Sequence, residues 1–403
     1  MKPISSVSTS VPVNPAQVMS DYARELKQQG RPVLSFCVGE PDFQTPSAIS
    51  AAGIRAIQDG CTKYSTAAGF LPLREAISEK LRSQRGVAIP AEQIVITGGA
   101  KLAVYAALQA LLNPGDEVLL PVPCWPSYMQ QIRLAGGVPV LVPTDEKENF
   151  SVTVEALKRC VSPRSKLMIL NQPCNPTGKV YSREELEKLC RFCHEQDLYI
   201  LSDEIYSGLV YTEQPFVSPA AIDEDAQNRT IVVGGASKSF AMTGWRVGYA
   251  AGNESIASVM ASCLSNMAGC ASTVSQMAAL EAYTASYDEA ERFCKAFRAR
   301  RDAMLHLLDE VDGIRVIRPE GAFYLFIDIR PFIGRVSDGA ALSDDVAFCR
   351  RLLEKQYVAL TPGSAFCRPG FVRWSFAADM DCLKLGVDRF RRFLDSLETG
   401  ERV

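Results

Sequence analysis

The chain has 403 residues, of which 47% are hydrophobic and 22% are charged, a composition typical of an ordinary globular protein. It disfavours a disordered, collagen-like or coiled-coil chain, and its length suits roughly two to three domains, or one large α/β domain with a smaller one. The 43 Lys and Arg residues and 46 Asp and Glu residues leave a net charge of −3, so neither a nucleic acid nor a membrane is an expected partner.

Short apolar runs alternate with helical patterns through the middle of the chain, which predicts an α/β fold. The expected strands are residues 94–97, 117–120, 138–142, 166–170, 198–202 and 230–233. The expected helices between them are about residues 101–112, 154–159 and 183–196. Because some runs are apolar throughout, as at 167–170, we expect strands buried on both faces of a mostly parallel sheet.

The pattern changes after about residue 285. A long charged helix is expected over 288–311, with strands near 314–317, 322–329 and 371–375 and helices over 343–355 and 379–397. This predicts a smaller α+β unit. The first forty residues precede the first strand of the sheet, so we expect them to join that unit. The predicted division is a large cofactor-binding domain over 45–287 and a small domain made of 1–44 and 288–403.

The cysteines and histidines bear on the compartment and on metal binding. The chain has 13 cysteines, its first dozen residues carry no apolar core segment, and no apolar run approaches the about 18 residues that span a bilayer. We therefore expect a cytoplasmic protein whose thiols are free. Because the only histidines are His194 and His306, no metal site is expected.

One cysteine cluster allows two interpretations. The run from Cys190 to His194 has the C-x-x-C-H spacing of c-type haem attachment. However, Ser182 and Glu185 have the spacing of a helix capping box, and apolar residues then recur at helical intervals through Cys190 and Cys193. The second pattern predicts that the two thiols lie on the apolar face of a helix.

Residues that suit catalysis gather after the expected strands, at the sheet edge where α/β proteins bind ligands. A glycine pair opens the helix after the first strand, and its bare backbone N–H groups suit a phosphate. A carboxylate, a tyrosine, an asparagine and a lysine at the same edge suggest a phosphorylated cofactor held through a Schiff base. The residues concerned are Gly98, Gly99, Lys101, Asn175, Asp203, Tyr206, Lys238 and Arg246.

Each of these residues also has a simpler interpretation. Asp203 could cap a helix, Lys238 could be a solvated loop charge, and Arg246 could belong to a surface ion pair. The cofactor site is the better interpretation because all of them follow strands of one sheet.

The run at 235–248, Gly-Ala-Ser-Lys-Ser-Phe-Ala-Met-Thr-Gly-Trp-Arg-Val-Gly, resembles the pyridoxal-phosphate attachment sequence of class-I aminotransferases. Further matches lie at 38–43, 62–64, 175–178, 202–206, 321–324 and 372–375. The resemblance covers nearly the whole chain and is greatest to the bacterial branch of aspartate aminotransferases. It implies fold type I, with a mostly parallel, seven-stranded-type sheet between helices in the large domain and a smaller α+β domain built from both chain ends.

The resemblance implies pyridoxal 5′-phosphate as the cofactor and assigns catalytic roles. Lys238 would bind the cofactor covalently and later move the substrate proton. Asp203 would keep the pyridine nitrogen protonated, and Tyr206 and Asn175 would hydrogen-bond the ring hydroxyl. Trp125 resembles the aromatic residue that stacks on the ring.

The resemblance also implies how the cofactor phosphate is bound. The phosphate would lie on the backbone of Gly99, Ala100 and Lys101, with Ser237 and Arg246 beside it.

The substrate and the partner subunit follow from the same resemblance. Arg373 would bind the substrate α-carboxylate by a bidentate pair, aided by the Gly39 backbone, with Trp125 and Asn175 on the same side. Family members are dimers with shared sites, so we expect a homodimer in which Tyr64 reaches into the partner's site.

Three features depart from the family pattern. Gly235 stands where animal-type aspartate enzymes carry a phosphate-binding serine, and Cys174 replaces a common asparagine. Residues 265–276 contain no arginine of the kind that binds the distal carboxylate in that branch. Lys101, which the bacterial branch uses for an acidic side chain, is the remaining candidate, although a lysine is also ordinary in a first helical turn.

The expected function is therefore transfer of an amino group between an L-amino acid, aspartate or glutamate by the Lys101 argument, and a 2-oxo acid in ping-pong half-reactions. The alternatives with the same cofactor are β-elimination or C–S lyase, decarboxylase and oxidase chemistry, or an aromatic amino acid or prephenate aminotransferase. A regulatory protein that has borrowed the fold is a third possibility, but the residues before the sheet are too few for a DNA-binding module.

Overall fold

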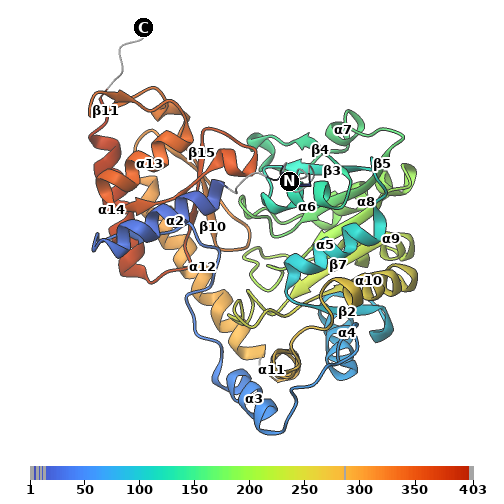
Figure 1. Ribbon diagram of the computed structural model, residues 1–403. Helices are drawn as coiled ribbons and strands as arrows, with labels where there is room; N and C mark the ends of the chain where they lie inside the picture. The colour runs from blue at the N-terminus through green and yellow to red at the C-terminus, as the bar shows by residue number, and fades with distance from the viewer. Residues whose placement is uncertain (1–3, 6–8, 10, 12–14, 286, 399–403) are drawn as a thin grey trace.

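The computed structural model describes residues 4–5, 9, 11, 15–285 and 287–398. The chain forms a large unit around a seven-stranded sheet and a smaller unit of helices on a four-stranded sheet, joined by the long helix α12 (Tyr287–Asp309) (Figure 1). Among the described residues, no helix combines the length and the apolar character that a membrane crossing requires.

The large sheet has the strand order β2-β8-β7-β6-β5-β3-β4. Strands β3 to β7 pair in parallel, and only β8 runs antiparallel to its two neighbours, β7 and β2. The mostly parallel α/β sheet that the sequence predicts is thus confirmed. The strands are β2 (Ile94–Thr97), β3 (Glu117–Val122), β4 (Val138–Pro143), β5 (Ser165–Asn171), β6 (Tyr199–Asp203), β7 (Thr230–Gly235) and β8 (Gly248–Ala251).

Both faces of this sheet are buried, which explains its apolar strands. Along β5, Ile169 belongs to the apolar cluster under α5 (Ala100–Leu111), whereas Met168 and Leu170 belong to the cluster under α8 (Arg183–Glu195). Successive side chains of a strand point to opposite faces, so an uninterrupted apolar run is what a doubly covered strand requires.

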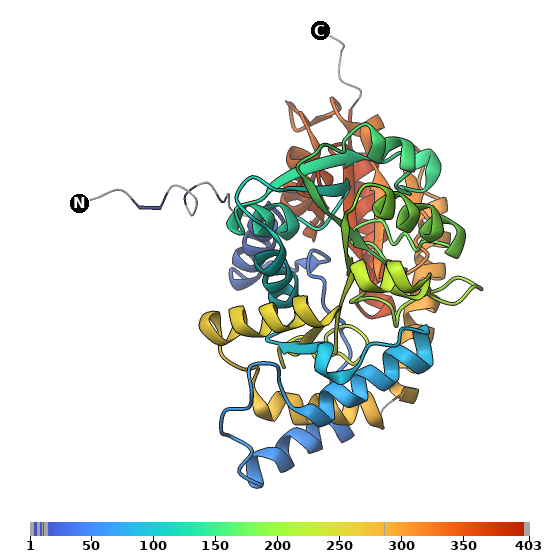
Figure 2. The same cartoon turned by 90° about the vertical axis from the view of Figure 1, so that its right-hand side faces the viewer.

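The remaining helices of the large unit cover these two faces and one edge. A third apolar cluster lies where three helices at the bottom of Figure 1 pack on β2 and β8, and Figure 2 shows the same helices from the side. The helices are α3 (Ser47–Gln58), α4 (Leu71–Arg85), α6 (Ser127–Leu134), α7 (Val154–Lys158), α9 (Glu224–Arg229), α10 (Glu254–Met267) and α11 (Thr273–Thr284).

Helix α8 settles the interpretation of the cysteine cluster. Ser182 and Glu185 form the predicted capping box, in which each side chain accepts a hydrogen bond from the other's backbone N–H. Cys190 and Cys193 are buried in the apolar cluster between α8 and the sheet, so the prediction of a helix face is confirmed. The 13 cysteines are all free thiols in the structure.

The small unit is built from the C-terminal part of the chain. Its antiparallel sheet has the order β14-β15-β10-β9, and helices α12, α13 and α14 pack on it around a core rich in phenylalanine. The elements are β9 (Arg315–Ile317), β10 (Tyr324–Asp328), α13 (Asp345–Gln356), β13 (Val358–Ala359), β14 (Thr361–Pro362), β15 (Phe371–Ser375) and α14 (Met380–Asp395).

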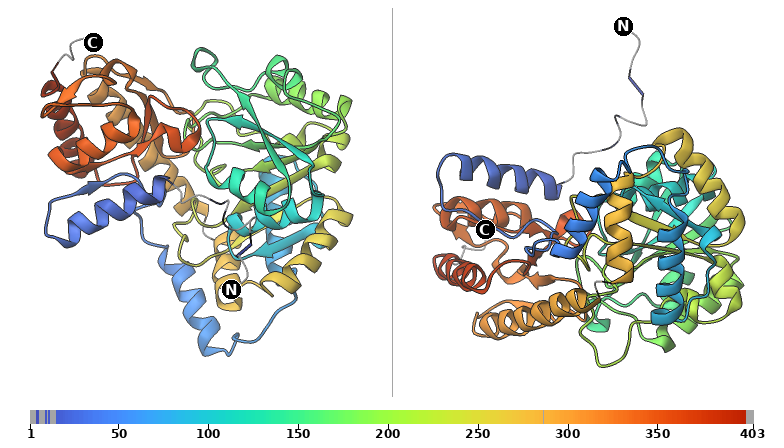
Figure 3. Two further views of the ribbon diagram at one scale, coloured as in Figure 1. Left: turned by 45° about the horizontal axis from the view of Figure 1, so that its top comes forward. Right: turned by 90° about the horizontal axis from the view of Figure 1, so that it is seen from below.

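The N-terminal part of the chain lies on this same unit. Helix α2 (Pro15–Gln28) runs beside the C-terminal elements in both views of Figure 3, and Met19 and Ala23 enter their core. Strand β1 (Leu34–Ser35) pairs in parallel with β13. These contacts support our proposal that the chain divides into a large domain, 45–287, and a small domain made of 1–44 and 288–403.

Candidate active site

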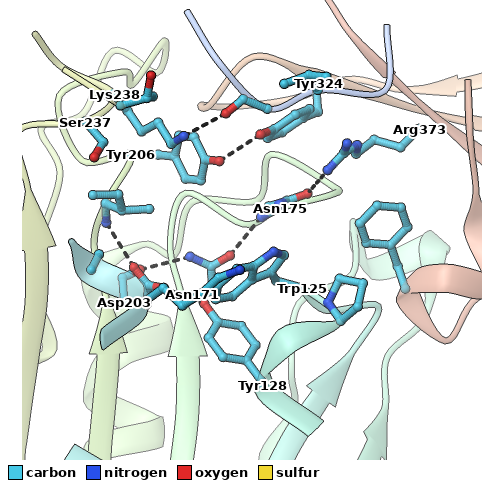
Figure 4. Close-up of a pocket in the computed structure, with 18 of the residues that line it drawn as sticks. Trp125, Tyr128, Asn171, Asn175, Asp203, Tyr206, Ser237, Lys238, Tyr324 and Arg373 are labelled. Carbon is cyan, nitrogen blue, oxygen red and sulfur yellow. Dashed lines mark hydrogen bonds between the residues drawn. The ribbon is translucent and has the colours of Figure 1, made fainter. Parts of the chain in front are cut away.

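The carboxyl ends of the parallel strands open into a cavity of about 380 Å³ that both units line. Most of its wall comes from loops of the large sheet, while Tyr324, Phe366 and Arg373 come from the small unit. The sequence-predicted residues that line it are Gly39, Ala100, Lys101, Trp125, Asn175, Asp203, Tyr206, Ser237, Lys238, Arg246 and Arg373. Figure 4 shows many of these side chains around one hollow.

Lys238 follows β7 and points into the cavity (Figure 4). Its Nζ donates a hydrogen bond to the Gly39 carbonyl oxygen at 2.6 Å. Burial lowers the pKa of Lys238 to about 8, assisted by the positive charges of Arg246 and Arg373 and opposed by Glu40. A lysine with this pKa is partly neutral near physiological pH, as a nucleophilic amine must be.

Asp203 is the last residue of β6, and its carboxylate is buried. Oδ2 accepts a hydrogen bond from the Tyr128 hydroxyl at 2.6 Å, and Oδ1 accepts one from the Ile205 backbone N–H at 3.2 Å. Burial raises the pKa of Asp203 to about 6, and these two donors hold it below what burial alone would give. The group is therefore ionised at neutral pH and suits a cationic N–H partner.

Tyr206 lies on the turn after Asp203 and faces the small unit. Its hydroxyl lies 2.7 Å from the hydroxyl of Tyr324, and burial raises the pKa of Tyr206 well above its usual value. Each hydroxyl is thus a neutral group that both donates and accepts. A Cβ at Gly39 would overlap the Tyr324 hydroxyl, so a side chain at this position is excluded by steric clash.

Arg373 on β15 is buried beside this tyrosine pair. Its Nη1 donates to Asn175 Oδ1 at 2.9 Å and its Nη2 donates to the Cys37 carbonyl at 2.5 Å. Its Nε has no hydrogen-bond partner within the described part of the chain. Arg373 lines the cavity, and a buried guanidinium there suits a carboxylate ligand.

An anion site lies at the start of α5. Gly99 is the cap of this helix and has a φ of 98°. As at the start of any α-helix, the first N–H groups of α5 have no partner inside the helix. A Cβ at Gly99 would overlap the guanidinium of Arg246, whose Nη2 donates to the Gly98 carbonyl at 3.2 Å. Open N–H groups, a helix dipole and an arginine together suit a phosphate, which fits the predicted cofactor.

Lys101 lies one residue further into α5. Its Nζ lies 5.0 Å from the centre of the Trp125 ring, and burial together with Arg246 lowers the pKa of Lys101. The ammonium thus faces the cavity beside the ring that the sequence predicts to stack on the cofactor.

Two predicted residues do not line the cavity. Gly99 contributes from beneath, through its turn and its contact with Arg246. Tyr64 is 95% exposed, so a site role for it requires another subunit, as the resemblance implies. Within the described chain, no group of three or more His, Cys, Asp or Glu could hold a metal ion.

The departures from the family pattern have structural reasons. A Cβ at Gly235 would lie 2.9 Å from the Val247 carbonyl oxygen, so no serine fits there, whereas Ser237 does line the cavity. Cys174 lies outside the cavity wall, and burial raises the pKa of its thiol, so it is a poor nucleophile.

Sequence reasoning missed Tyr128 and Tyr324 as site residues. Tyr324 lies within a run that matches the family, but no role was assigned to it. Tyr128 is the second residue of α6, three positions after Trp125, and only the fold brings it to Asp203.

The family described as aminotransferase class I and II matches residues 31–389. A probable aspartate/prephenate aminotransferase of Aquifex aeolicus is 42% identical over 386 residues, or 95% of this chain and 96% of that protein. The aspartate aminotransferase of Thermus thermophilus, solved with maleate, superposes with a TM-score of 0.91 at 39% identity over 97% of this chain and all of that one. The aspartate aminotransferase of Rhizobium meliloti superposes with a TM-score of 0.95 at 36% identity, over 99% of this chain and 100% of that one.

The chain belongs to the class I and II aminotransferase family. It is therefore a transaminase, an enzyme that exchanges amino groups between amino acids and 2-oxo acids, as the sequence predicts. The family implies pyridoxal phosphate as the cofactor.

Proposed function

We propose that this aminotransferase uses pyridoxal 5′-phosphate to move an amino group from aspartate or glutamate to a 2-oxo acid. The observation that carries this proposal is that three side chains line one cavity: Lys238, whose pKa burial lowers to about 8, the buried carboxylate Asp203 and the buried Arg373. Bound pyridoxal phosphate supplies an electron sink beside the substrate Cα.

The residues around the cavity would hold the cofactor at three points. The N–H groups at the start of α5, with Ser237 and Arg246, would hold the phosphate. Asp203 would accept a hydrogen bond from the pyridine N–H, and its ionised state at neutral pH supports this role. Tyr206 and Asn175 would hydrogen-bond the ring oxygen.

Lys238 would both attach the cofactor and act as the base. Its Nζ, once displaced by the amino substrate, would take the proton from the substrate Cα. The pKa of about 8 supports this role, since an amine whose pKa lies near the working pH can both take up and release a proton.

Arg373, which lines the cavity, would bind the substrate α-carboxylate, and Asn175 would keep the guanidinium oriented. Lys101 would bind the distal carboxylate. The names of the Aquifex and Thermus relatives support an acidic donor, and the maleate in the Thermus structure is itself a dicarboxylate.

The Aquifex relative's name also includes prephenate, and this supports a second candidate. Prephenate is a bulkier 2-oxo acid with an additional carboxylate, and Lys101 beside Trp125 offers it both a charge and an aromatic face. It would serve as an alternative acceptor for the same aspartate or glutamate amino group.

We further propose a homodimer in which Tyr64 reaches the partner's phosphate site, supported by its 95% exposure. A cytoplasmic location is supported by the free thiols.

The experiment is to reconstitute the wild type and Lys101→Met with pyridoxal phosphate and compare kcat/KM for aspartate and phenylalanine. Loss of the distal charge pair should lower the aspartate-to-phenylalanine ratio by about tenfold or more. Lys158→Met, an exposed lysine on α7, is the matched control and should leave the ratio unchanged. An unchanged ratio in Lys101→Met would refute Lys101 as the acidic-side-chain residue, and a wild type that binds no cofactor would refute the proposal as a whole.

A further inference from the structure

A buried ion pair lies behind the turn that carries Asp203 and Tyr206. Glu204, between them in sequence, is not part of the cavity wall, and its side chain is fully buried. Its Oε2 accepts a hydrogen bond from Arg85 Nη1 at 2.6 Å. The roles proposed for the cofactor site leave both members of this pair unused.

Arg85 makes a second contact with the same turn. Its Nη2 donates to Ser207 Oγ at 2.5 Å, so one guanidinium binds the residues on both sides of Tyr206. Arg85 is the last residue of α4, and Phe216 packs on its guanidinium at 5.5 Å. The arginine is thereby held in place by elements other than the turn.

The other oxygen of Glu204 is also satisfied. Oε1 accepts hydrogen bonds from Ser202 Oγ at 3.0 Å and Ser218 Oγ at 2.5 Å. The backbone is also held, since the Glu204 N–H donates to the Val233 carbonyl at 2.8 Å. Glu204 is thus fixed to β6, to the neighbouring strand β7 and to α4 at once.

We propose that Arg85 is a positioning residue that, by binding Glu204 and Ser207 together, fixes the turn that presents Asp203 and Tyr206 to the cofactor. The inference rests on the proposed function, because it gives Asp203 and Tyr206 their cofactor roles. Within the described chain, Arg85 does not line the cavity, and its guanidinium hydrogen-bonds Glu204 and Ser207 rather than a residue proposed to bind the cofactor. It would therefore act through the turn.

The charges around the pair are consistent with this role. The negative charge of Glu204 raises the pKa of Asp203, and Arg85 beside Glu204 offsets that charge. The groups that face the pair from the surrounding elements are Lys80 on α4, Tyr249 on β8 and Tyr283 on α11. Burial and Arg85 lower the pKa of Lys80 to about 7, so Arg85 is the principal cation facing Glu204.

The test compares Arg85→Met with the double variant Arg85→Met/Glu204→Gln. The single variant leaves a buried carboxylate without its cation and should lose both thermal stability and cofactor affinity, the latter by roughly tenfold or more. The double variant removes the uncompensated charge, so its melting temperature should recover. Its cofactor affinity should stay low, because Ser207 still lacks the hydrogen bond from Arg85.

The measurements are the dissociation constant for pyridoxal phosphate, the melting temperature, and amide exchange across residues 205–208 in the apo protein. Faster exchange in that turn is expected in both variants. Arg164→Met is the matched control, since it removes another Arg–Glu pair with a 2.6 Å contact at the amino end of β3, and its affinity and turn exchange should match the wild type.

Recovery of affinity together with melting temperature in the double variant would overturn the proposal, because the effect would then be one of stability alone. Wild-type affinity in Arg85→Met would overturn it as well. If Arg85→Met does not fold, the soluble double variant decides by the same affinity measurement. A wild type that binds no cofactor would contradict the proposed function instead. Amide exchange across residues 205–208 would then still test whether Arg85 fixes the turn.

Discussion

At the scale of single residues, burial moves the pKa values of Lys238 and Asp203 toward neutrality, to about 8 and about 6. The two shifts have opposite directions because desolvation disfavours whichever form is charged. Neighbouring charges then set how far the pKa of Lys238 falls, and two hydrogen-bond donors limit how far that of Asp203 rises. Tyr128 matters most here, since its hydroxyl is the first of the donors that hold the Asp203 pKa down.

Tyr128→Phe tests this residue. Removal of one donor to a buried carboxylate should raise the pKa of Asp203 by about one unit, equivalent to about 1.4 kcal/mol. Asp203 must be ionised to accept the pyridine N–H, so the acid limb of cofactor affinity should move upward from about pH 6. Affinity would fall most between pH 5 and 7 and recover above the new midpoint.

The measurement is the pyridoxal-phosphate dissociation constant between pH 5 and 8.5. Tyr181→Phe removes another buried tyrosine hydroxyl, one that accepts from a backbone N–H outside the cavity, and serves as the control. An acid limb that stays at the wild-type pH in Tyr128→Phe would show that Tyr128 does not tune Asp203.

At the scale of elements, the parallel strands bring the chemistry to one edge. Asp203, Asn175 and Lys238 come from β6, the turn after β5 and the loop after β7, and they meet because adjacent parallel strands end side by side. The same logic applies to α5, whose first turn opens at that edge after β2.

Gly99→Ala tests the anion site at the start of α5. The φ of 98° disfavours any side chain, and the added Cβ would displace the Arg246 guanidinium. We expect cofactor affinity to fall by about tenfold and the free energy of unfolding to fall by about 1 kcal/mol.

Gly98→Ala is the matched control, since its Cβ would meet only Leu102 Cδ2 at 3.6 Å. It should bind pyridoxal phosphate as the wild type does. Equal affinities in the two glycine variants would refute a phosphate site on this turn.

At this scale the sequence predicts the parallel strands and helix α8, but it misses strand β8 and the contact that Tyr128 makes. The parallel strands were predictable because runs such as 167–170 are apolar on both faces, and α8 was predictable from its capping box. Strand β8 was missed because Gly248–Ala251 is short and made mostly of small residues. Tyr128 could not be assigned, because its contact with Asp203 spans 75 positions and depends on tertiary packing.

At the scale of the whole molecule, the cavity exists only between the two units. Arg373 and Tyr324 come from the small unit, while Lys238 and Asp203 come from the large sheet. A change in the relative position of the two units would therefore alter the cavity wall without altering the strands of either sheet. In the proposed homodimer, the exposed Tyr64 would extend the same principle to a second subunit.

Mixed dimers test the shared site. Tyr64→Ala and Lys238→Ala subunits should each be nearly inactive alone. If they are refolded together, a mixed dimer has one site with Lys238 from one subunit and Tyr64 from the other. Random pairing should then restore about a quarter of wild-type activity per site. No recovery in a mixture shown to contain mixed dimers would place Tyr64 outside the partner's site.

The most direct test of the account is a single half-reaction. Wild-type protein loaded with pyridoxal phosphate is mixed with aspartate, and separately with glutamate, without any 2-oxo acid. The visible band of the lysine-bound cofactor should be replaced by that of its aminated form, with one 2-oxo acid released per site, and Lys238→Ala should show no such conversion. A spectral change without release of one 2-oxo acid per site, or no spectral change with either donor, would contradict the proposed function.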